Sequence, residues 1–556
     1  MTANDPAFEW RCLSPLAKVF PGEEPAAARE EGSALIGEHV SFQVAYRSAA
    51  LLRRIRVDVE TALPGTVSVR AVGLVPSELP NYADHDGYVL RTAPGLYPDP
   101  LYPLGADGVH APPGQWRAVW VTVRPEGAGA AGVHPIRVRF ADEAGLPLGE
   151  ACFRLAVHGA ELPEQELLHT EWFYADCLAT QYKTAMFSEA HWALIEAYAR
   201  FYADHGMNMI LTPLFSPPLE LDPGRERPTV QLVGVRRDGE RYAFDFARLA
   251  RWVDVCRRAG IAHFEFAHLF TQWGAKHAPK IMAGTEEGEE RIFGWESDAD
   301  GAAYRAFLAQ FVPELLAFVR GQGLEERVWF HVSDEPWIGD MPHYERASKL
   351  LRSLIGDYPV LDALSDYRFY AEGLLSHPVV STEHIDVFLE RGADNLWAYY
   401  CCCEYKHGES NRFMAMPSER TRIIGAQLYK FGLQGFLHWG FNHWYSQRSR
   451  KAIDPYACTD ADLGFPSGDA FLVYPGADGP VGSVRLELLR SAMQDARALR
   501  LLERLSGREA AIRCLEEDAE EPLTFRQYPR DPAWLLGMRE RVNRRIAEAA
   551  AGGCIR

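Results

Sequence analysis

Two adjacent carboxylic acids, Asp334 and Glu335, are the residues of this sequence best suited to catalysis. They follow an apolar run at 327–333 that is typical of a buried strand, and a proline and Trp337 come after them. Carboxyl groups at the point where a strand opens into a loop can work as general acid and general base. The alternative is that one of the two caps the following helix.

The adjacency of the two carboxyls also bears on mechanism. A retaining glycosidase with its own nucleophile needs carboxyls about 5–5.5 Å apart on opposite sides of the sugar, and an inverting one needs about 6.5–9.5 Å. Neighbours on a strand point to opposite faces and reach one pocket only where the strand twists or ends. They then approach from one side, which suits substrate-assisted hydrolysis by the 2-acetamido oxygen of the sugar.

Aromatic residues follow several of the expected strands. Their flat faces can bury the apolar face of a pyranose, and their polar edges can hydrogen-bond. Packing in the core is the alternative for any single tryptophan, whereas the run at 439–445 favours a pocket wall. The candidate substrate-binding residues are Trp172, His268, Trp273, Trp337, Tyr399, Tyr400, Trp439, Asn442 and Trp444.

The elements that must position these residues alternate between strand and helix from about residue 167 onward. Eight strand–helix units predict an α/β fold of the (β/α)8 TIM barrel type, whose active site lies at the carboxyl ends of the strands. An open doubly wound sheet is the alternative, but it usually carries a glycine-rich phosphate turn, and none is present. We expect strands at 168–174, 208–213, 263–269, 327–333, 360–365, 385–389, 395–401 and 435–439, and helices at 188–205, 245–259, 301–322, 342–355 and 419–432.

Three segments of different texture make up the chain. Residues 1–163 have short alternating runs separated by turn residues, which predicts an N-terminal β-sandwich domain. Residues 164–480 form the expected catalytic barrel. Residues 481–556 supply the last barrel helix and a helical C-terminal extension, with helices at 484–506 and 532–551.

Composition excludes several classes of partner. The 58 Lys and Arg against 76 Asp and Glu give a net charge of −18, which argues against nucleic acid as a ligand. No signal peptide and no stretch of about 18 uncharged apolar residues is visible, so we expect a cytoplasmic protein without a membrane span. The ten cysteines show no zinc-site spacing, and Cys401–Cys403 are expected to be small buried residues beneath the site. We expect neither a metal nor a cofactor.

The sequence resembles glycoside hydrolase family 123 over roughly residues 90–500. The matching pieces are Asp334-Glu335 and the segments 97–103, 397–400, 435–444, 474–476 and 485–490. The resemblance implies an N-terminal β-sandwich, a (β/α)8 barrel and β-N-acetylgalactosaminidase activity through an oxazoline intermediate. The substrate would be a glycan with a terminal N-acetylgalactosamine.

The resemblance also implies roles for individual residues. Glu335 would be the general acid/base, and Asp334 would orient the acetamido N–H and stabilise the oxazolinium. A tyrosine at the end of the seventh strand would bind the acetamido oxygen, with Tyr400 the first choice and Tyr399 the second, because alternation admits only one. Trp439 and Trp444 would form the floor and wall, and Asn442 would contact a sugar hydroxyl. The alternatives are a β-hexosaminidase that prefers N-acetylglucosamine and a non-hydrolytic carbohydrate-binding barrel.

Overall fold

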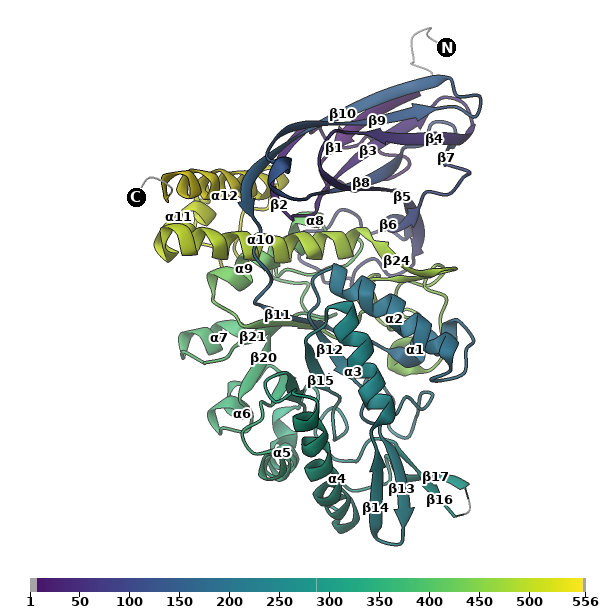
Figure 1. The fold of residues 1–556 in the computed structure, drawn as a ribbon, viewed down its shortest axis with the longest axis vertical. Helices are drawn as coiled ribbons and strands as arrows, with labels where there is room; N and C mark the ends of the chain where they lie inside the picture. The colour runs from purple at the N-terminus through teal and green to yellow at the C-terminus, as the bar shows by residue number, and fades with distance from the viewer. Residues whose placement is uncertain (1–7, 287, 554–556) are drawn as a thin grey trace.

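The computed structural model describes residues 8–286 and 288–553, which form a mixed α/β fold. A β-sandwich occupies the upper part of Figure 1, and the α/β part lies below it. One sandwich sheet has the order β2 (Glu31–Ile36), β10 (Pro147–Glu161), β9 (Gly132–Ala141), β4 (Leu52–Glu60) and β7 (Val109–Ala111). The other has the order β1 (Phe8–Leu13), β3 (Val40–Ser48), β8 (Arg117–Pro125), β5 (Gly65–Ser77), β6 (Gly95–Pro103), β24 (Gly479–Ser483) and β23 (Tyr474–Gly476).

Strand β8 shows why the second sheet is buried on both faces. Val119, Val121 and Val123 point into the sandwich core, while Ala118 and Trp120 point the other way and pack with the C-terminal helices. This alternation follows from the period of two along a strand. The sandwich is therefore fixed to the rest of the molecule through one of its own sheets.

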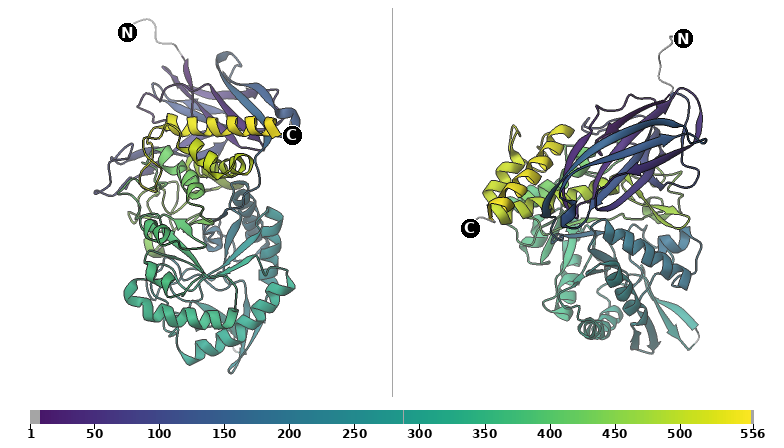
Figure 2. Two further views of the ribbon diagram at one scale, coloured as in Figure 1. Left: turned by 90° about the vertical axis from the view of Figure 1, so that its left-hand side faces the viewer. Right: turned by 45° about the horizontal axis from the view of Figure 1, so that its top comes forward.

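Three C-terminal helices join the two parts. Helix α10 (Val484–Ser506) runs between the sandwich and the α/β part, and α11 (Arg508–Glu516) and α12 (Pro532–Gly553) pack beside the sandwich (Figures 1 and 2). At the start of α10 the Arg485 guanidinium donates two hydrogen bonds of 2.8 Å to the buried carboxylate of Asp99 on β6. The segment 97–103 is thus part of a strand that connects the sandwich to α10.

The α/β part contains two parallel sheets. One has the order β11 (Leu168–Glu171), β22 (Gly435–His438), β21 (Trp397–Tyr399), β20 (His377–Ser381) and β19 (Leu361–Leu364), and the other has β12 (Met209–Thr212), β15 (His263–Phe266) and β18 (Val328–Phe330). A parallel backbone bridge from Phe330 to Val360 connects them, so the carboxyl ends of β18 and β19 lie at the same edge.

Helices cover the outside of these sheets, as the left view of Figure 2 shows. They are α1 (Ala175–Gln181), α2 (Glu189–Asp204), α3 (Ala247–Ala259), α4 (Ala302–Gly321), α5 (Met341–Ile355), α6 (Tyr367–Ala371), α7 (Ile385–Glu390), α8 (Ser418–Arg422) and α9 (Ile424–Lys430). Two hairpins extend this part: β13 (Gly234–Asp238) with β14 (Arg241–Asp245), and β16 (Ile281–Thr285) with β17 (Gly288–Phe293). Helix α4 is long and apolar enough to cross a membrane by length and composition alone, but Phe307, Phe311 and Leu315 lie fully buried in the core.

One predicted strand is wrong. Residues 385–389 form helix α7, in which Ile385 and Phe388 face inward three positions apart, as on a helix. The strand at this place in the order is β20 (His377–Ser381), whose Pro378 lacks an N–H and made the segment look unlike a strand. The predicted helix at 419–432 is divided into α8 and α9.

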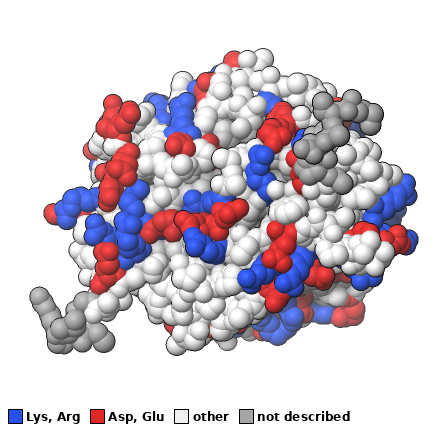
Figure 3. All heavy atoms as spheres, turned by 90° about the horizontal axis from the view of Figure 1, so that it is seen from above, with Lys and Arg blue, Asp and Glu red and all other residues white. Residues whose placement is uncertain are grey.

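Both signs of charge are spread over the surface. On the face seen from above in Figure 3, acidic and basic side chains interleave. The net charge of −18 is therefore not collected into one acidic patch on that face.

Candidate active site

Asp334 and Glu335 lie just beyond the end of β18. Hydrogen bonds to the neighbouring strand β19 hold the backbone of this segment in place. The carboxylate of Asp362 on β19 accepts hydrogen bonds from the N–H groups of Val332 (3.1 Å) and Ser333 (3.2 Å). The N–H of Glu335 donates to the carbonyl of Ala363 over 3.1 Å. Glu335 has a φ of 41°, a strained conformation for a residue with a side chain that costs on the order of 1–3 kcal/mol. This turn breaks the alternation of the strand and lets both carboxyls line the same pocket.

That inner pocket is a small space with six aromatic rings in its walls. It lies where the residues after β11, β15, β18, β21 and β22 meet, so it is built from strand ends. Its polar walls are carboxyl groups and its flat walls are indole and phenol rings. The inner pocket is lined by Trp172, Tyr174, Glu220, Gln272, Trp273, Asp334, Glu335, Tyr399, Cys401, Cys402, Trp439 and Phe465 together with Leu219, Ala363 and Leu437.

A wider cavity of about 880 Å³ adjoins the inner pocket. Glu335, Tyr399 and Cys401 line both spaces. The outer cavity also carries Trp337, which is 70% exposed, and Tyr367. Glu335 therefore stands at the junction between a pocket of restricted size and an open cavity.

Tyr399, and not Tyr400, faces the carboxyl pair, which corrects the first choice made from the sequence. The Tyr399 hydroxyl donates to Glu335 Oε1 over 2.7 Å. Tyr400 is fully buried against Phe436 and His438, and its hydroxyl makes no hydrogen bond within the described part of the chain. Neighbouring strand residues point to opposite sides, and the register of β21 decides which one enters the pocket.

The electrostatics of the pair favour a shared proton. Burial raises the pKa of Asp334 well above its ordinary value, and the charge of Glu335 raises it further. Burial also raises the pKa of Glu335, while the hydrogen bond from Tyr399 lowers it in part. Two carboxylates in one poorly solvated pocket do not both ionise readily, so the pair keeps its last proton to a higher pH than an isolated carboxyl group does.

A buried histidine lies beneath the pair. His331 Nδ1 is 2.8 Å from Asp362 and its Nε2 is 2.6 Å from Glu265. Burial alone would lower the pKa of His331, but the hydrogen bonds to the two carboxylates outweigh it and raise the pKa to about 9. His331 is therefore a cation at neutral pH, and its charge lowers the pKa of the nearby Asp334. Glu265 in turn accepts from the indole N–H of Trp172 over 2.7 Å, which links this cluster to the pocket wall.

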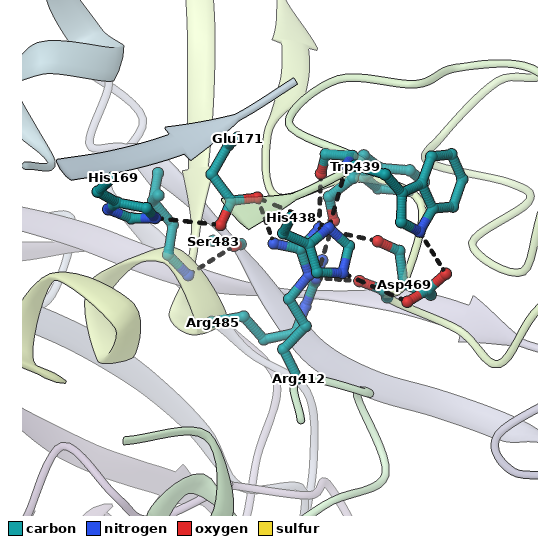
Figure 4. Close-up of polar contacts among 12 residues, drawn as sticks. His169, Glu171, Arg412, His438, Trp439, Asp469, Ser483 and Arg485 are labelled. Carbon is teal, nitrogen blue, oxygen red and sulfur yellow. Dashed lines mark hydrogen bonds and ion pairs between the residues drawn. The ribbon is translucent and has the colours of Figure 1, made fainter. Parts of the chain in front are cut away.

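A second buried network supports Trp439 (Figure 4). Arg412 donates to Glu171 over 2.6 Å and to His438 Nδ1 over 2.7 Å, and His438 Nε2 points at Asp469 from 3.4 Å. Asp469 accepts from the indole N–H of Trp439 over 3.1 Å. Burial raises the pKa of Asp469 to about 7, although the Arg412 charge opposes this. This chain of contacts fixes the plane of the Trp439 ring at the pocket.

Besides Tyr400, three further predicted substrate-binding residues lie outside both spaces. Asn442 is fully buried and exchanges hydrogen bonds with the backbone of Tyr174, at 2.8 and 3.0 Å. The indole N–H of Trp444 donates to the Val473 carbonyl in the core. His268 stacks on His331 at 4.1 Å, and burial and the His331 charge lower its pKa well below the ordinary value. Core packing accounts for these three, while Trp172, Trp273 and Trp439 line the inner pocket and Trp337 lines the outer cavity.

Several residues of the site were missed from the sequence. Glu220 and Asp469 follow no recognisable strand end, and Asp362 and Glu265 lie inside strands where an acidic residue interrupts an apolar run. For Asp362 and Glu265 the one signal in the sequence was an acidic residue inside an otherwise apolar strand. Glu404 is buried behind Cys401, and burial raises its pKa to about 8.

Comparison with solved structures supports the fold. A family 123 glycoside hydrolase from Clostridium perfringens, studied for glycolipid glycan hydrolysis, aligns over 98% of both chains with a TM-score of 0.75 and 13% identity. A putative β-galactosidase from Bacteroides fragilis aligns over 88% of this chain and 61% of its own with a TM-score of 0.32 and 8% identity, too distant to bear on the fold. No curated protein sequence matches the chain.

The family model described as glycoside hydrolase 123, catalytic domain, matches residues 172–502. This match spans more than half of the chain and contains both carboxyls and both spaces around them. The residues that line the inner pocket therefore all lie within the matched segment. The chain belongs to glycoside hydrolase family 123, and it is a glycoside hydrolase.

Proposed function

We propose that this glycoside hydrolase is a retaining exo-β-N-acetylgalactosaminidase that uses the acetamido group of its substrate as the nucleophile. The observation that carries the proposal is that Asp334 and Glu335 are consecutive, follow one strand and line one pocket with aromatic walls. From such positions they approach the sugar from the same side. A separate enzymic nucleophile would have to come from the opposite side of the anomeric carbon.

In the first step the acetamido carbonyl oxygen attacks C1, and the bond from C1 to the leaving oxygen breaks. Glu335 gives its proton to that oxygen. Asp334 accepts a hydrogen bond from the acetamido N–H and stabilises the positive charge of the oxazolinium. In the second step a water molecule gives a proton to Glu335 and attacks C1, which reopens the ring. Two inversions at C1 give net retention.

Substrate binding also decides where the shared proton resides. Asp334 must accept the acetamido N–H, so it is the ionised partner, and His331 below it favours that state. The proton is then left on Glu335, the partner that needs it. The Tyr399 hydroxyl, which donates to Glu335 in the free enzyme, is able to turn to the acetamido oxygen, and the loss of that bond raises the pKa of Glu335.

The shapes of the two spaces support an exo mode of action. The enclosed inner pocket suits one terminal sugar stacked against indole rings, and the open outer cavity suits the leaving group. Trp337 at the rim offers a flat face to a second sugar. The glycolipid glycans of the Clostridium perfringens relative are one class of leaving group that this cavity could accept.

We further propose that the two parallel sheets belong to one (β/α)8 barrel. The Phe330–Val360 bridge connects β18 to β19, and the N–H of Asn208, just before β12, donates to the carbonyl of His169 on β11 over 3.2 Å. These contacts support a closed ring of eight strands whose carboxyl ends surround the site.

The p-nitrophenyl β-glycosides of N-acetylgalactosamine, N-acetylglucosamine and galactose test the activity. We expect rapid release from the first, slower release from the second, and almost none from galactose, because it lacks the acetamido nucleophile. Preference for the gluco epimer would instead identify a β-hexosaminidase. Appreciable turnover of the plain galactoside would contradict substrate assistance, and no turnover of any of the three would favour a binding protein.

Single substitutions separate the roles of the two carboxyls. Glu335→Gln should lower the rate by about 10²–10⁴-fold on substrates with poor leaving groups, the range of general acid catalysis, and by much less on p-nitrophenyl substrates. Asp334→Asn should lower the rate with both, because it acts on the acetamido step. The exposed Glu326→Gln and Asp357→Asn are matched controls that should leave the rates unchanged. Wild-type turnover of an oligosaccharide by either site variant would refute the assigned role.

A further inference from the structure

Three consecutive cysteines, Cys401, Cys402 and Cys403, gather their sulfur atoms in the turn after β21. The three Sγ atoms lie within 4.8 Å of one another, and those of Cys402 and Cys403 are 3.9 Å apart. Along a strand, neighbouring side chains would point in opposite directions, so the turn is what brings them together. Two thiolates bound tetrahedrally to one zinc ion at about 2.3 Å would stand about 3.8 Å apart. The sulfur atoms therefore already have the spacing of a ligand set.

The turn is held in this shape by groups other than the thiols. The N–H of Cys401 donates to the Glu404 carboxylate over 2.7 Å, and the Asn411 amide donates to the carbonyls of Cys401 (2.6 Å) and Glu404 (2.8 Å). The N–H of Tyr405 donates to the Cys403 carbonyl over 3.1 Å. A ligand that binds the thiols does not have to order the backbone first, which favours tight binding.

The cluster can be reached from the substrate cleft. Cys401 lines both spaces, Cys402 lines the inner pocket, and Cys403 lines the outer cavity, where it is exposed. The outer cavity is therefore an entry path to the sulfur atoms. Because Tyr399 and Glu335 line the same wall, anything bound to the thiols lies beside the proposed general acid.

The surroundings of the cluster are acidic. Glu335 and Glu404 line the outer cavity together with Cys401 and Cys403. Carboxyl groups beside the thiols favour a bound cation, which can replace the protons of the thiols.

We infer that Cys401, Cys402 and Cys403 form a binding site for one soft, thiophilic metal ion of the cadmium(II), mercury(II) or copper(I) class, and that the bound ion inhibits hydrolysis by obstructing the cleft. Thiolate ligands select such ions over hard cations. On binding, each S–H bond is replaced by a sulfur–metal bond and the proton passes to solvent, with no change of oxidation state. The binding site is independent of the proposed activity, and only the inhibition rests on it.

Cadmium chloride titrated into the full chain tests this inference. The protein is kept reduced with a phosphine, and three signals are recorded: the ultraviolet sulfur-to-cadmium charge-transfer band, the protons released, and hydrolysis of p-nitrophenyl β-N-acetylgalactosaminide. We expect the charge-transfer band to saturate at one equivalent of cadmium, with release of protons. Inhibition of hydrolysis should have the same midpoint cadmium concentration as the band, and a chelator should reverse it. Rates are expressed relative to the metal-free rate of each variant.

Variants identify the ligands. The exposed Cys403→Ser should weaken cadmium binding at least about tenfold, and Cys402→Ser with Cys403→Ser should abolish the band. Cys152→Ser, in strand β10 of the sandwich, removes a sulfur elsewhere and should leave the band and its midpoint unchanged.

Three results would overturn the inference. A band that persists in the double variant, or one that does not appear in the wild type, refutes the site. A one-equivalent band without loss of turnover refutes the inhibition. If the chain hydrolyses none of the substrates, the band and the proton release still decide the site. If the double variant does not fold, Cys403→Ser alone decides it.

Discussion

Removal of the Tyr399 hydroxyl is expected to move the pH dependence of hydrolysis upward. This hydroxyl donates to Glu335 over 2.7 Å inside the site and lowers the pKa of Glu335. A hydrogen bond to a charged group contributes about 1.5–3 kcal/mol, which equals about 1–2 pKa units. Tyr399→Phe should therefore raise the pKa that governs the acid form of the carboxyl pair by about 1–2 units.

The sign of the effect follows from the role of Glu335. A general acid must be protonated, so the alkaline limb of kcat/KM against pH reports the pKa of the acid, and a higher pKa moves that limb to higher pH. The measurement requires a β-N-acetylgalactosaminide with an unactivated alcohol as leaving group, because proton donation then limits the rate. If Tyr399 also binds the acetamido oxygen, the maximum rate falls as well.

Tyr400→Phe is the matched control. It deletes the hydroxyl of the adjacent tyrosine, which is buried and makes no hydrogen bond in the described structure. Its alkaline limb should coincide with that of the wild type. A Tyr399→Phe limb that stays in place or moves to lower pH, or an equal shift in both variants, would refute the reasoning.

Two further predictions concern the buried histidine and the rim of the cavity. Since the pKa of folded His331, about 9, exceeds its ordinary value of about 6.5, its stabilising contribution is complete below pH 6.5 and is lost as pH rises through 9. Urea unfolding should show this loss in the wild type but not in His331→Gln, which should also cost about 3–5 kcal/mol because Glu265 and Asp362 lose their cation; the same pH dependence in both proteins would contradict the assignment. Trp337→Ala should raise KM several-fold for substrates with a sugar leaving group and change the free energy of unfolding by less than about 0.5 kcal/mol, since the side chain is exposed; an unchanged KM would exclude Trp337 from binding.

The sequence predicted the carboxyl pair because Asp334 and Glu335 follow a clear apolar strand, and position at a strand end is readable from local pattern. It predicted that only one of the adjacent residues Tyr399 and Tyr400 points into the pocket. It could not decide which one, since that depends on the register of β21 against its partner strands. Asp362 was missed because its role arises from contacts with a different strand.

The aromatic residues show where local pattern fails. Trp439 and Trp444 belong to one run after one strand, yet the first lines the pocket and the second donates to a core carbonyl. Asn442 is polar, but its side chain accepts a hydrogen bond from the Tyr174 N–H and so connects the segment after β22 to the segment after β11. Whether such a residue faces a ligand or a neighbouring segment depends on packing between elements distant in sequence, which composition and spacing do not contain.

The central claim is that the substrate supplies the nucleophile, and one series of rates tests it most directly. β-Galactosaminides that carry acetyl, fluoroacetyl, difluoroacetyl and trifluoroacetyl groups on the 2-nitrogen differ in the nucleophilicity of the carbonyl oxygen and little in size. If that oxygen attacks C1, kcat/KM must fall steeply with each added fluorine. Rates that stay level across the series would mean that another group attacks, and would contradict the account.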